Sequence, residues 1–472
     1  MVEKKHVKFS GSVVIVGFGS VAQGALPLLL RHIDMPRERI SIITGDDRGH
    51  AEAADYGISY SIKPLTRANY RALLEPLLGK GDFLINLSVD VASIALAEWC
   101  CENGVMYLDT CIEPWLGGYT DQRVSPSHRS NYGQREEMLA LRKKFPAGPT
   151  VMPTHGANPG LISHWVKQAM VNIADDILGE STVPKSKAEW AALAMRLNVK
   201  SVHCSERDTQ IAHPRKRPGE FVNTWSVDGF IGEGSQPCEL GWGSHEKHFP
   251  HDGKRHAYGC DAAIYLTRPG ASVQVRTWTP CAKAFHGFLI THGESVSVSD
   301  YFTVKNDKGE VAYRPTCHYA YHPSDDTVVS IHELAGRGWV GQEQRRVLTG
   351  DVIAGTDELG ALLLGHARGA YWYGSTITIE EARNLAPYNN ATSIQVAAGI
   401  LGAVVWAMEN PNAGIVDPDE IDFQRVLAVA NPYLGKVHGE YTDWTPLKGR
   451  HHPFAEDVDE SDAWQFKNIR VM

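Results

Sequence analysis

The segment SVVIVGFGSVAQG, residues 12–24, constrains the fold of this chain more than any other part of its sequence. A short apolar run ends at two glycines, and a helical pattern follows at once, so the motif G-x-G-x-x-A lies between an expected strand and an expected helix. Gly17 allows a tight turn, and Gly19 lets the backbone approach a pyrophosphate. Ala22 keeps the helix close to the sheet, and the free N–H groups of its first turn can bind phosphates. The segment therefore predicts a dinucleotide-binding strand–turn–helix.

A second expected strand supports this interpretation. Residues 39–45 contain three isoleucines, and Asp46 follows them about 20 residues beyond the glycine motif, where such folds place the acid that binds a ribose hydroxyl. The alternative is an ordinary strand–turn–helix that binds no cofactor. The motif, the second strand and the acid together favour NAD binding.

Two more strands are expected over residues 82–88 and 105–111, with an alanine-rich helix between them. Alternating strands and helices predict a doubly wound parallel sheet, in which ligands bind beyond the carboxyl ends of the strands. Six polar residues follow these strand ends and should form the rim where a nicotinamide ring would lie: Asn86, Ser88, Asp90, Asp109, Thr110 and Glu113.

A chain of 472 residues is too long for one compact core, so we expect two or three domains. Residues 1–155 are expected to form an NAD-binding Rossmann domain and residues 156–384 a second α/β domain with a mixed sheet. An apolar helix within 385–410 should pack back on the first domain, and 411–472 should be a C-terminal extension that wraps the surface.

Local patterns refine the second domain. Asn158 suits an N-cap and Pro159 the first position of a helix that would begin there. The turn Gly232-Glu233-Gly234 is expected to join two strands. Alternating polar and apolar residues predict strands within 200–210, 221–226, 262–267 and 272–279.

Composition narrows the class of function. The net charge of −9 provides no positive field for nucleic acid or an anionic membrane. The first ten residues are polar and basic rather than signal-like, and no apolar run reaches the length of a transmembrane helix. The eight cysteines form no C-x-x-C pair and no disulfide framework, so we expect reduced thiols in a cytoplasmic protein.

The chemistry is expected in the second domain. No G-x-S-x-G nucleophile motif occurs, and the histidines within 245–251 have no accompanying carboxylate or cysteine at a known spacing, so no metal is expected. Glu206, Glu233 and His292 accompany Trp225, and acids beside an indole face suit a cationic ligand. Each residue taken singly is more often structural, so these patterns alone indicate only an NAD-dependent enzyme with an unknown substrate.

A resemblance specifies the reaction. The chain resembles the bacterial homospermidine synthases along essentially its whole length, in the segments GFGSVAQG (17–24), NLSVD (86–90), THGANPG (154–160), CSERDTQ (204–210), FVNTWS (221–226) and NNATS (389–393). That family is similar in fold to the saccharopine dehydrogenases and is usually homodimeric. The resemblance implies a redox-neutral aminobutyl transfer: NAD-dependent oxidation of putrescine to an imine, attack by a second putrescine with loss of ammonia, and re-reduction to homospermidine.

The resemblance also implies site residues. Catalytic roles fall to Glu206, Trp225, His292, Asn158 and Glu233, with Glu206 as the first candidate base and His292 as the second. Asp90 and Glu113 would bind the ammonium groups, and Asp357 would lie nearer the entrance. The residues expected to bind the cofactor are Gly17, Gly19, Ser20, Val21, Asp46, Asn86, Ser88, Asp109, Thr110, Ala157 and Asn158.

Two alternatives remain open at this point. A net reductase of the saccharopine or carboxynorspermidine dehydrogenase type would need arginines directed at a substrate carboxylate, for which Arg207 and Arg276 are candidates. A non-catalytic NAD-sensing protein would bind NAD without converting any diamine. The preferred donor, putrescine alone or spermidine, is also left open.

Overall fold

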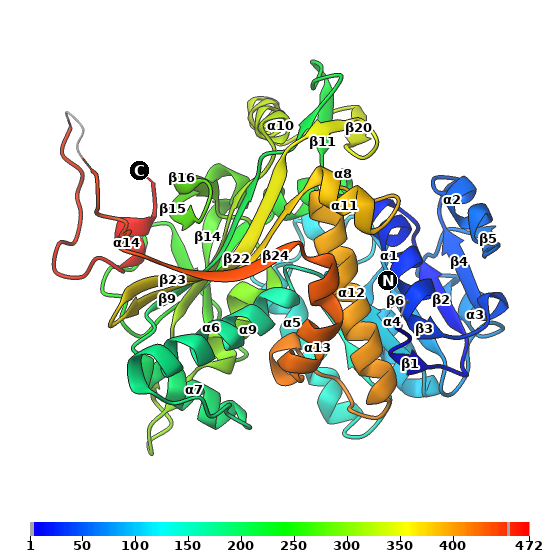
Figure 1. Ribbon diagram of the computed structural model, residues 1–472, viewed down its shortest axis with the longest axis horizontal. Coiled ribbons are helices and arrows are strands. Elements are labelled where there is room, and N and C mark those ends of the chain that lie inside the picture. Colours follow the sequence, from blue (N-terminus) through cyan, green and yellow to red (C-terminus); the bar gives the residue numbers. More distant parts are fainter. Residues whose placement is uncertain (1–3, 451–453, 472) are drawn as a thin grey trace.

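A computed structural model describes residues 4–450 and 454–471 of the chain. Two large sheets form the two ends of the molecule, and helix α12 (Ala391–Glu409) runs between them (Figure 1). The N-terminal sheet lies on the blue side of the picture and the larger sheet on the green and yellow side. This is the α/β fold expected, with a Rossmann domain followed by a domain built on a mixed sheet.

The N-terminal sheet is six-stranded and wholly parallel, in the order β5-β4-β2-β6-β7-β8. Its strands are β2 (Val13–Val16), β4 (Ile40–Thr44), β5 (Ser59–Ile62), β6 (Phe83–Asn86), β7 (Met106–Asp109) and β8 (Val151–Met152). Every residue of β2 and β6 is buried, as expected where helices cover both faces of a parallel sheet. The strand order reverses between β2 and its neighbours, which creates the crevice for a ligand.

The connecting helices are α1 (Ser20–His32), α2 (His50–Asp55), α3 (Tyr70–Leu74), α4 (Ser93–Asn103) and α5 (Asn131–Lys144), and a short pair β1 (Val7–Lys8) and β3 (Ile33–Asp34) lies beside α1. The turn before α1 requires glycine at Gly17, whose φ is +81° and where a Cβ would lie 2.7 Å from the Ser88 Cα. The glycine motif therefore brings the end of β2 against the segment that follows β6.

The second sheet is ten-stranded and mixed, with the main order β13-β14-β12-β19-β9-β22-β23-β24 and the hairpin β15–β16 joined through β19. Only the β9–β19 pair is parallel. The strands are β9 (Ser201–Asp208), β12 (Pro237–Gly241), β13 (Gly253–Arg255), β14 (Ala263–Pro269), β15 (Gln274–Thr279), β16 (Lys283–Phe288), β19 (Thr316–His322), β22 (Thr356–His366), β23 (Gly369–Thr378) and β24 (Lys436–Thr442).

Helices and small strand pairs surround this sheet. The helices are α6 (Leu161–Leu178), α7 (Lys187–Leu197), α8 (Val227–Ser235), α9 (Gly293–Tyr301), α10 (Asp325–Gly336) and α11 (Ile379–Leu385), and the pairs are β10 (Ile211–Ala212) with β21 (Val352–Ala354), β11 (Glu220–Asn223) with β20 (Gln344–Val347), and β17 (Val304–Lys305) with β18 (Val311–Tyr313). Helix α6 packs on β22 and β23, and α9 packs on β12 and β19.

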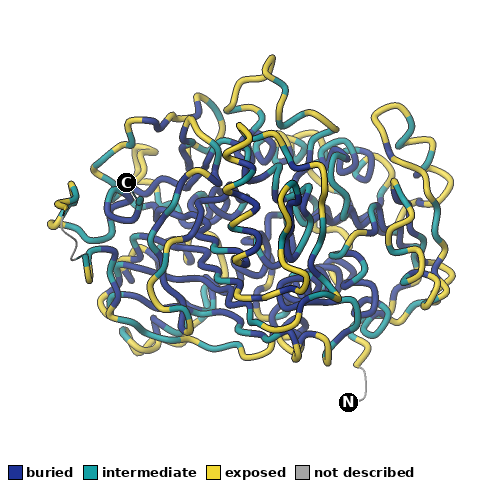
Figure 2. The backbone as a smooth tube through the Cα atoms, turned by 90° about the horizontal axis from the view of Figure 1, so that it is seen from above, coloured by how far each residue is buried: buried dark blue, intermediate teal, exposed yellow. Residues whose placement is uncertain are grey.

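Helix α12 packs against α1 of the first sheet and α13 (Phe423–Ala430). It is 19 residues long and apolar enough to span a membrane by length and composition, so the expectation that no such run exists is wrong. Because 89% of its most apolar 18-residue stretch is buried in the protein, α12 is a core helix. The buried parts of the backbone fill the middle of the molecule, and the exposed segments lie mainly at its periphery (Figure 2). Close packing needs Gly399, where a Cβ would lie 2.1 Å from the Gly156 carbonyl oxygen.

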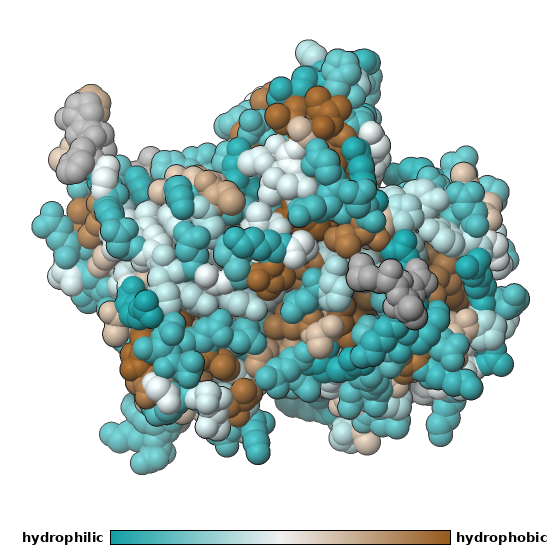
Figure 3. All heavy atoms as spheres, in the orientation of Figure 1, coloured by the Kyte–Doolittle hydropathy of each residue, from teal (hydrophilic) through white to brown (hydrophobic). Residues whose placement is uncertain are grey.

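The C-terminal segment, which is expected from the sequence to wrap the surface, also contributes buried residues to the core and a strand to the large sheet. Helix α13 buries Val426 and Leu427 against α12, and β24 completes an edge of the large sheet. Ile415 forms a bridge to β8, and α14 (Phe466–Ile469) contacts β15. Large exposed apolar residues such as Leu116, Val340 and Ile353 are scattered, and the face in Figure 3 is mainly hydrophilic.

Two local predictions are wrong. Helix α6 begins at Leu161, with Gly160 as its N-cap. The position requires glycine, because φ is +127° and a Cβ there would lie 2.2 Å from the Gly156 carbonyl oxygen. Asn158 is therefore outside the helix and free to project from the loop. Glu233 lies in helix α8 rather than in a turn, because the Ser226 side chain accepts from the Gly229 N–H and caps this glycine-rich helix.

Candidate active site

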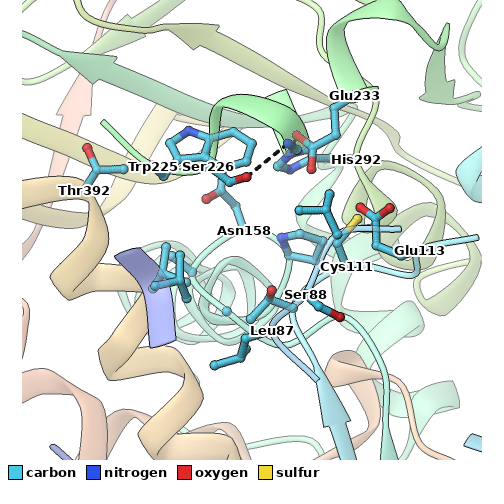
Figure 4. Close-up of a pocket in the computed structure, with 18 of the residues that line it drawn as sticks. Leu87, Ser88, Cys111, Glu113, Asn158, Trp225, Ser226, Glu233, His292 and Thr392 are labelled. Carbon is cyan, nitrogen blue, oxygen red and sulfur yellow. Dashed lines mark hydrogen bonds and ion pairs between the residues drawn. The ribbon is translucent and has the colours of Figure 1, made fainter. Parts of the chain in front are cut away.

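A cavity of about 830 Å³ lies between the carboxyl ends of the parallel strands and the large sheet. Both domains line it, so the groups expected from the two halves of the sequence meet here (Figure 4). From the Rossmann domain come Val21, Asn86, Ser88, Thr110, Cys111 and Glu113, and from the rest of the chain come Ala157, Asn158, Glu206, Trp225, Glu233, His292, Tyr319 and Thr392.

A second cavity, of about 840 Å³, runs along the strand ends and shares Ser88 and Val89 with the first. Gly17, Thr44 and Gly45 line it. The N-cap of α1 is Gly19, so its N-cap residue has no side chain to cap the N–H groups of the first turn. The free N–H groups at this helix start, from Ser20 and Val21, can therefore bind phosphates. No Cβ contact would arise within 4 Å at Gly19, so the surface above it is open. These features fit a dinucleotide that extends from the second cavity into the first.

Two expected cofactor contacts are already engaged within the protein. Asp46 accepts from the Arg48 side chain, with Nε–Oδ2 at 2.9 Å, and from the Arg48 N–H at 3.0 Å, and these bonds lower its pKa. Asp109 is buried, and its carboxylate accepts from the Thr154 N–H at 2.6 Å and the Tyr107 hydroxyl at 2.7 Å. Asp109 therefore holds the segment before Asn158 in place from beneath the cavity.

Glu206 lies on β9 with its side chain in the first cavity. Its Oε2 accepts from the Asn158 Nδ2 at 3.1 Å and from the Tyr319 hydroxyl. Burial raises the pKa of Glu206 to about 8, against the opposing effect of these hydrogen bonds. A carboxyl with a pKa near the working pH suits general acid–base catalysis.

His292 is held between two carboxylates. Its Nε2 lies 3.0 Å from the Glu233 Oε2, and its Nδ1 lies 3.2 Å from the Glu294 Oε1. Burial alone would lower the pKa of His292, but Glu294 and Glu233 raise it to about 10. The ring also lies against Tyr319, with centroids 4.3 Å apart. His292 is therefore an imidazolium at neutral pH, which favours Glu206 as the base.

Glu113 lines the cavity beside Cys111 (Figure 4). Burial, and then the charge of Glu233, raise the pKa of Glu113 to about 8. Asp90, which is expected from the sequence to bind an ammonium group beside Glu113, lines the second cavity instead. Burial of the Cys111 thiol raises its pKa, so this thiol is neutral.

Trp225 forms one wall of the first cavity, and its ring packs edge-on against Phe230 with centroids 5.7 Å apart. Asp357 lies behind the wall rather than on it. It is fully buried on β22, and its Oδ2 bonds to the hydroxyl of Thr392, which does line the cavity.

Sequence reasoning missed Tyr319 and Glu294. Tyr319 links Glu206 to His292, because its hydroxyl bonds to Glu206 and its ring lies against the His292 ring at a tilt of 33°. Its signal was the alternation of aromatic and histidine residues along 318–322, which resembles any buried strand. Glu294 follows His292 by two residues and is buried in the first turn of α9.

The arrangement suits a small cationic ligand. Three glutamates, Glu206, Glu233 and Glu113, face one cavity together with the indole of Trp225. Among the described residues, no lysine or arginine lines this cavity. Within the same described part of the chain, no group of three or more His, Cys, Asp or Glu residues is arranged to bind a metal ion.

Two family models cover most of the chain. The one described as Saccharopine dehydrogenase NADP binding domain matches residues 13–152, and the one described as Saccharopine dehydrogenase C-terminal domain matches residues 156–443.

Full-length relatives are more specific. The chain is 50% identical over 467 residues to homospermidine synthase of Blastochloris viridis, covering 98% of each chain. It is 48% identical over 470 residues to that of Mesorhizobium japonicum, covering 98% of this chain and 97% of the relative. A crystal structure of homospermidine synthase from Legionella pneumophila in complex with NAD matches with a TM-score of 0.92 at 48% identity, over 98% of both chains. Apo saccharopine dehydrogenase of Saccharomyces cerevisiae matches in fold alone, with a TM-score of 0.53 at 10% identity, over 92% of this chain and all of that one.

The charge state of His292 can be tested directly. We expect its ring nitrogens to keep imidazolium ¹⁵N shifts from about pH 6 to about pH 9. Replacing Glu294→Gln removes one of the two carboxylates, so the pKa of His292 should fall by about 1–2 units. The measurement is NMR of ¹⁵N-histidine-labelled protein, with Glu137→Gln as a control carboxylate elsewhere. A wild-type His292 that titrates near its ordinary pKa would contradict this geometry.

Proposed function

The chain belongs to the homospermidine synthase family, and from this premise we propose that it joins two putrescines into homospermidine with release of ammonia. Spermidine would serve as an alternative aminobutyl donor, with release of diaminopropane. The observation that carries the proposal is the meeting of Glu206, Trp225 and Glu233 in one cavity at the carboxyl ends of the Rossmann strands.

The charge of the cavity supports a diamine substrate. An alkylamine resembles lysine, with a pKa of about 10.4, so a diamine arrives with two positive charges. Glu113 and Glu206 have raised pKa values because they are buried, and an ammonium group placed beside them would favour their ionised forms. The substrate thus supplies counter-charges that no lysine or arginine provides among the described residues lining the cavity.

The cofactor site supports the redox part of the proposal. The structural relative from Legionella pneumophila contains NAD, and here Gly17, Ser88 and the start of α1 offer the corresponding groove. NAD bound there would accept a hydride from the carbon beside one amine and later return it. Proton transfer, orientation of the substrate and exclusion of water depend on the side chains around the cavity.

Glu206 acts as the base in this proposal. It accepts a proton from one ammonium of the first putrescine, because a carbon can lose a hydride only next to a neutral amine. The reacting ammonium of the second putrescine gives up two protons as its nitrogen bonds to the imine carbon and becomes the new imine nitrogen, and both protons leave on the departing ammonium ion. Glu206 then returns its own proton to the product nitrogen. Two dications thus become one trication and one ammonium ion, and no net proton is consumed.

Trp225 stabilises the cationic imine, and His292 and Glu233 orient the ammonium groups of the substrate. The face of Trp225 would lie against the cationic imine, an interaction that can contribute about 2 kcal/mol when desolvated. The His292 Nε2 lies 3.0 Å from the Glu233 Oε2, which orients the Glu233 side chain to accept a hydrogen bond from an ammonium group. Asn158 fixes the rotamer of Glu206. The walls also exclude water that would hydrolyse the imine.

A net reductase of the saccharopine dehydrogenase type is less well supported. Its substrate carboxylate would need an arginine, but Arg207 pairs with Asp325 at 3.1 Å and Arg276 pairs with Glu456 at 3.1 Å. Neither arginine lines the first cavity. We further propose a cytoplasmic homodimer, and the eight free cysteines support a reducing compartment.

An isotope experiment tests the reaction. Putrescine deuterated on its amine-bearing carbons should give homospermidine that retains the transferred deuterium, because the hydride returns to the same molecule. Ammonia should appear in equimolar amount, and NADH should not accumulate. Mass spectrometry and an ammonia assay measure these quantities. Steady formation of NADH, or dilution of the label by added unlabelled NADH, would favour a net dehydrogenase.

Substitutions of Trp225 test the role of the indole. Trp225→Ala should lower kcat by about 30-fold, the equivalent of about 2 kcal/mol, whereas Trp225→Phe keeps an aromatic face and should lose about fivefold or less. Steady-state kinetics with putrescine measures both, and unchanged NAD affinity serves as the folding control. Equal losses in the two variants would remove the cation–π contribution.

A further inference from the structure

A buried pair of aspartates lies beside Glu206 on the inner face of the large sheet. Asp208 on β9 is directly opposite Asp357 on β22 in the antiparallel register, and Glu206 is two residues from Asp208 on the same face. Asp208 and Asp357 are both 0% exposed. Among the described residues no lysine or arginine forms an ion pair with either carboxylate, since the Arg207 guanidinium contacts the Asp208 carbonyl oxygen and pairs with Asp325.

Hydrogen bonds distinguish the two members of the pair. The Asp208 Oδ1 accepts from the Gln210 N–H at 2.8 Å and from its Nε2 at 3.1 Å. The Asp208 Oδ2 accepts from the Thr224 hydroxyl at 2.8 Å. The Gln210 side chain also accepts from the Ala391 N–H at 2.9 Å, which fixes it against the first turn of α12. The positive end of this helix lies near both aspartates, because Thr392 in the same turn contacts each of them. Asp208 is therefore equipped to hold a negative charge.

Asp357 lacks this support. Its Oδ2 contacts the Thr392 hydroxyl, and its Oδ1 is buried without a hydrogen-bond partner among the described residues. Two facing carboxylates in a buried site cannot both ionise, so one of them keeps a proton. Burial raises the pKa of both groups, and the charges of Glu206 and Asp208 add to the rise at Asp357. The proton of the pair therefore belongs on Asp357.

The groups that face Glu206 from the neighbouring elements are few. They are Asp208 on β9, Tyr319 and Tyr321 on β19, Asp357 on β22, His292 before α9, and the uncharged Asn158, Thr224 and Thr392. Of these, His292 carries positive charge and is paired with Glu233 and Glu294, and Asp208 is the acid whose hydrogen bonds favour a negative charge. The charge of Asp208 raises the pKa of Glu206, while the Tyr319 hydroxyl and His292 lower it.

We propose that Asp208 is a positioning residue of this reaction, whose fixed negative charge keeps Glu206 a strong enough base, while Asp357 stores the proton of the buried pair. The proposal rests on the proposed function, in which Glu206 borrows a proton from a substrate ammonium. It assigns different roles to two aspartates that are equivalent by burial and by register. In the resting enzyme Asp357 is neutral, and an ammonium group that approaches Thr392 would displace its proton.

The pH dependence of kcat/KM separates these roles. In wild type the acid limb reports ionisation of Glu206 in the free enzyme. Asp208→Asn keeps the shape and the acceptor oxygen but removes the charge, so the limb should move about one pH unit lower. Asp357→Asn replaces a neutral group by a neutral group and should leave the position of the limb unchanged, whatever its effect on KM. Tyr319→Phe removes a hydrogen bond to Glu206 and should move the limb higher. An unmoved limb in Asp208→Asn, or a lower limb in Asp357→Asn, overturns the proposal.

A second measurement does not depend on turnover. Infrared difference spectra between wild type and Asp357→Asn at neutral pH should contain the C=O band of a protonated carboxyl, which shifts in D₂O. Spectra between wild type and Asp208→Asn should contain ionised carboxylate bands instead. The reverse pattern overturns the proposal even if wild type forms no homospermidine. Correct infrared bands without any homospermidine would refute the proposed function and leave the charge assignment standing.

Discussion

Burial of several carboxyl groups without lysine or arginine partners is the constraint on which this site depends. Glu206, Glu113 and Asp357 all lie in an environment that raises their pKa values, and no lysine or arginine enters the cavity from the described residues. Such groups are costly to ionise until a cation arrives. The site therefore discriminates by charge: a ligand with two ammonium groups satisfies carboxyl groups that a neutral or anionic ligand would leave unpaired.

The fold creates this environment by joining two sheets through one helix. The strand ends of the Rossmann sheet provide the cofactor groove, and the inner face of the large sheet provides Glu206, with Tyr319 on the adjacent strand. Helix α12 connects the two, with Gly399 against the Gly156 carbonyl and Thr392 at the cavity wall. This glycine contact therefore holds the loop that carries Asn158 against α12.

The sequence predicts the first domain better than the second because its signals are local. A glycine motif between an apolar run and a helix has one common structural outcome, whereas Glu233 in a Gly-Glu-Gly segment fits a turn as well as the capped helix observed. Resemblance identified most of the residues that line the cavity. It did not separate Asp357 from them, or Asp90, because whether a carboxylate lies on a wall or behind it depends on strand register and on helix packing. Tyr319 and Glu294 were missed for the same reason.

The central claim is that carboxyl groups held neutral by burial ionise when the diamine binds. Calorimetric titration of putrescine into the NAD-loaded enzyme, repeated near neutral pH in buffers of different ionisation enthalpy, measures the protons exchanged on binding. We expect release of roughly one proton or more per putrescine, since the pKa values of Glu113 and Glu206 lie at about 8 before binding. Binding without proton release would show that these carboxyl groups are already ionised in the free enzyme, and that burial does not hold them neutral.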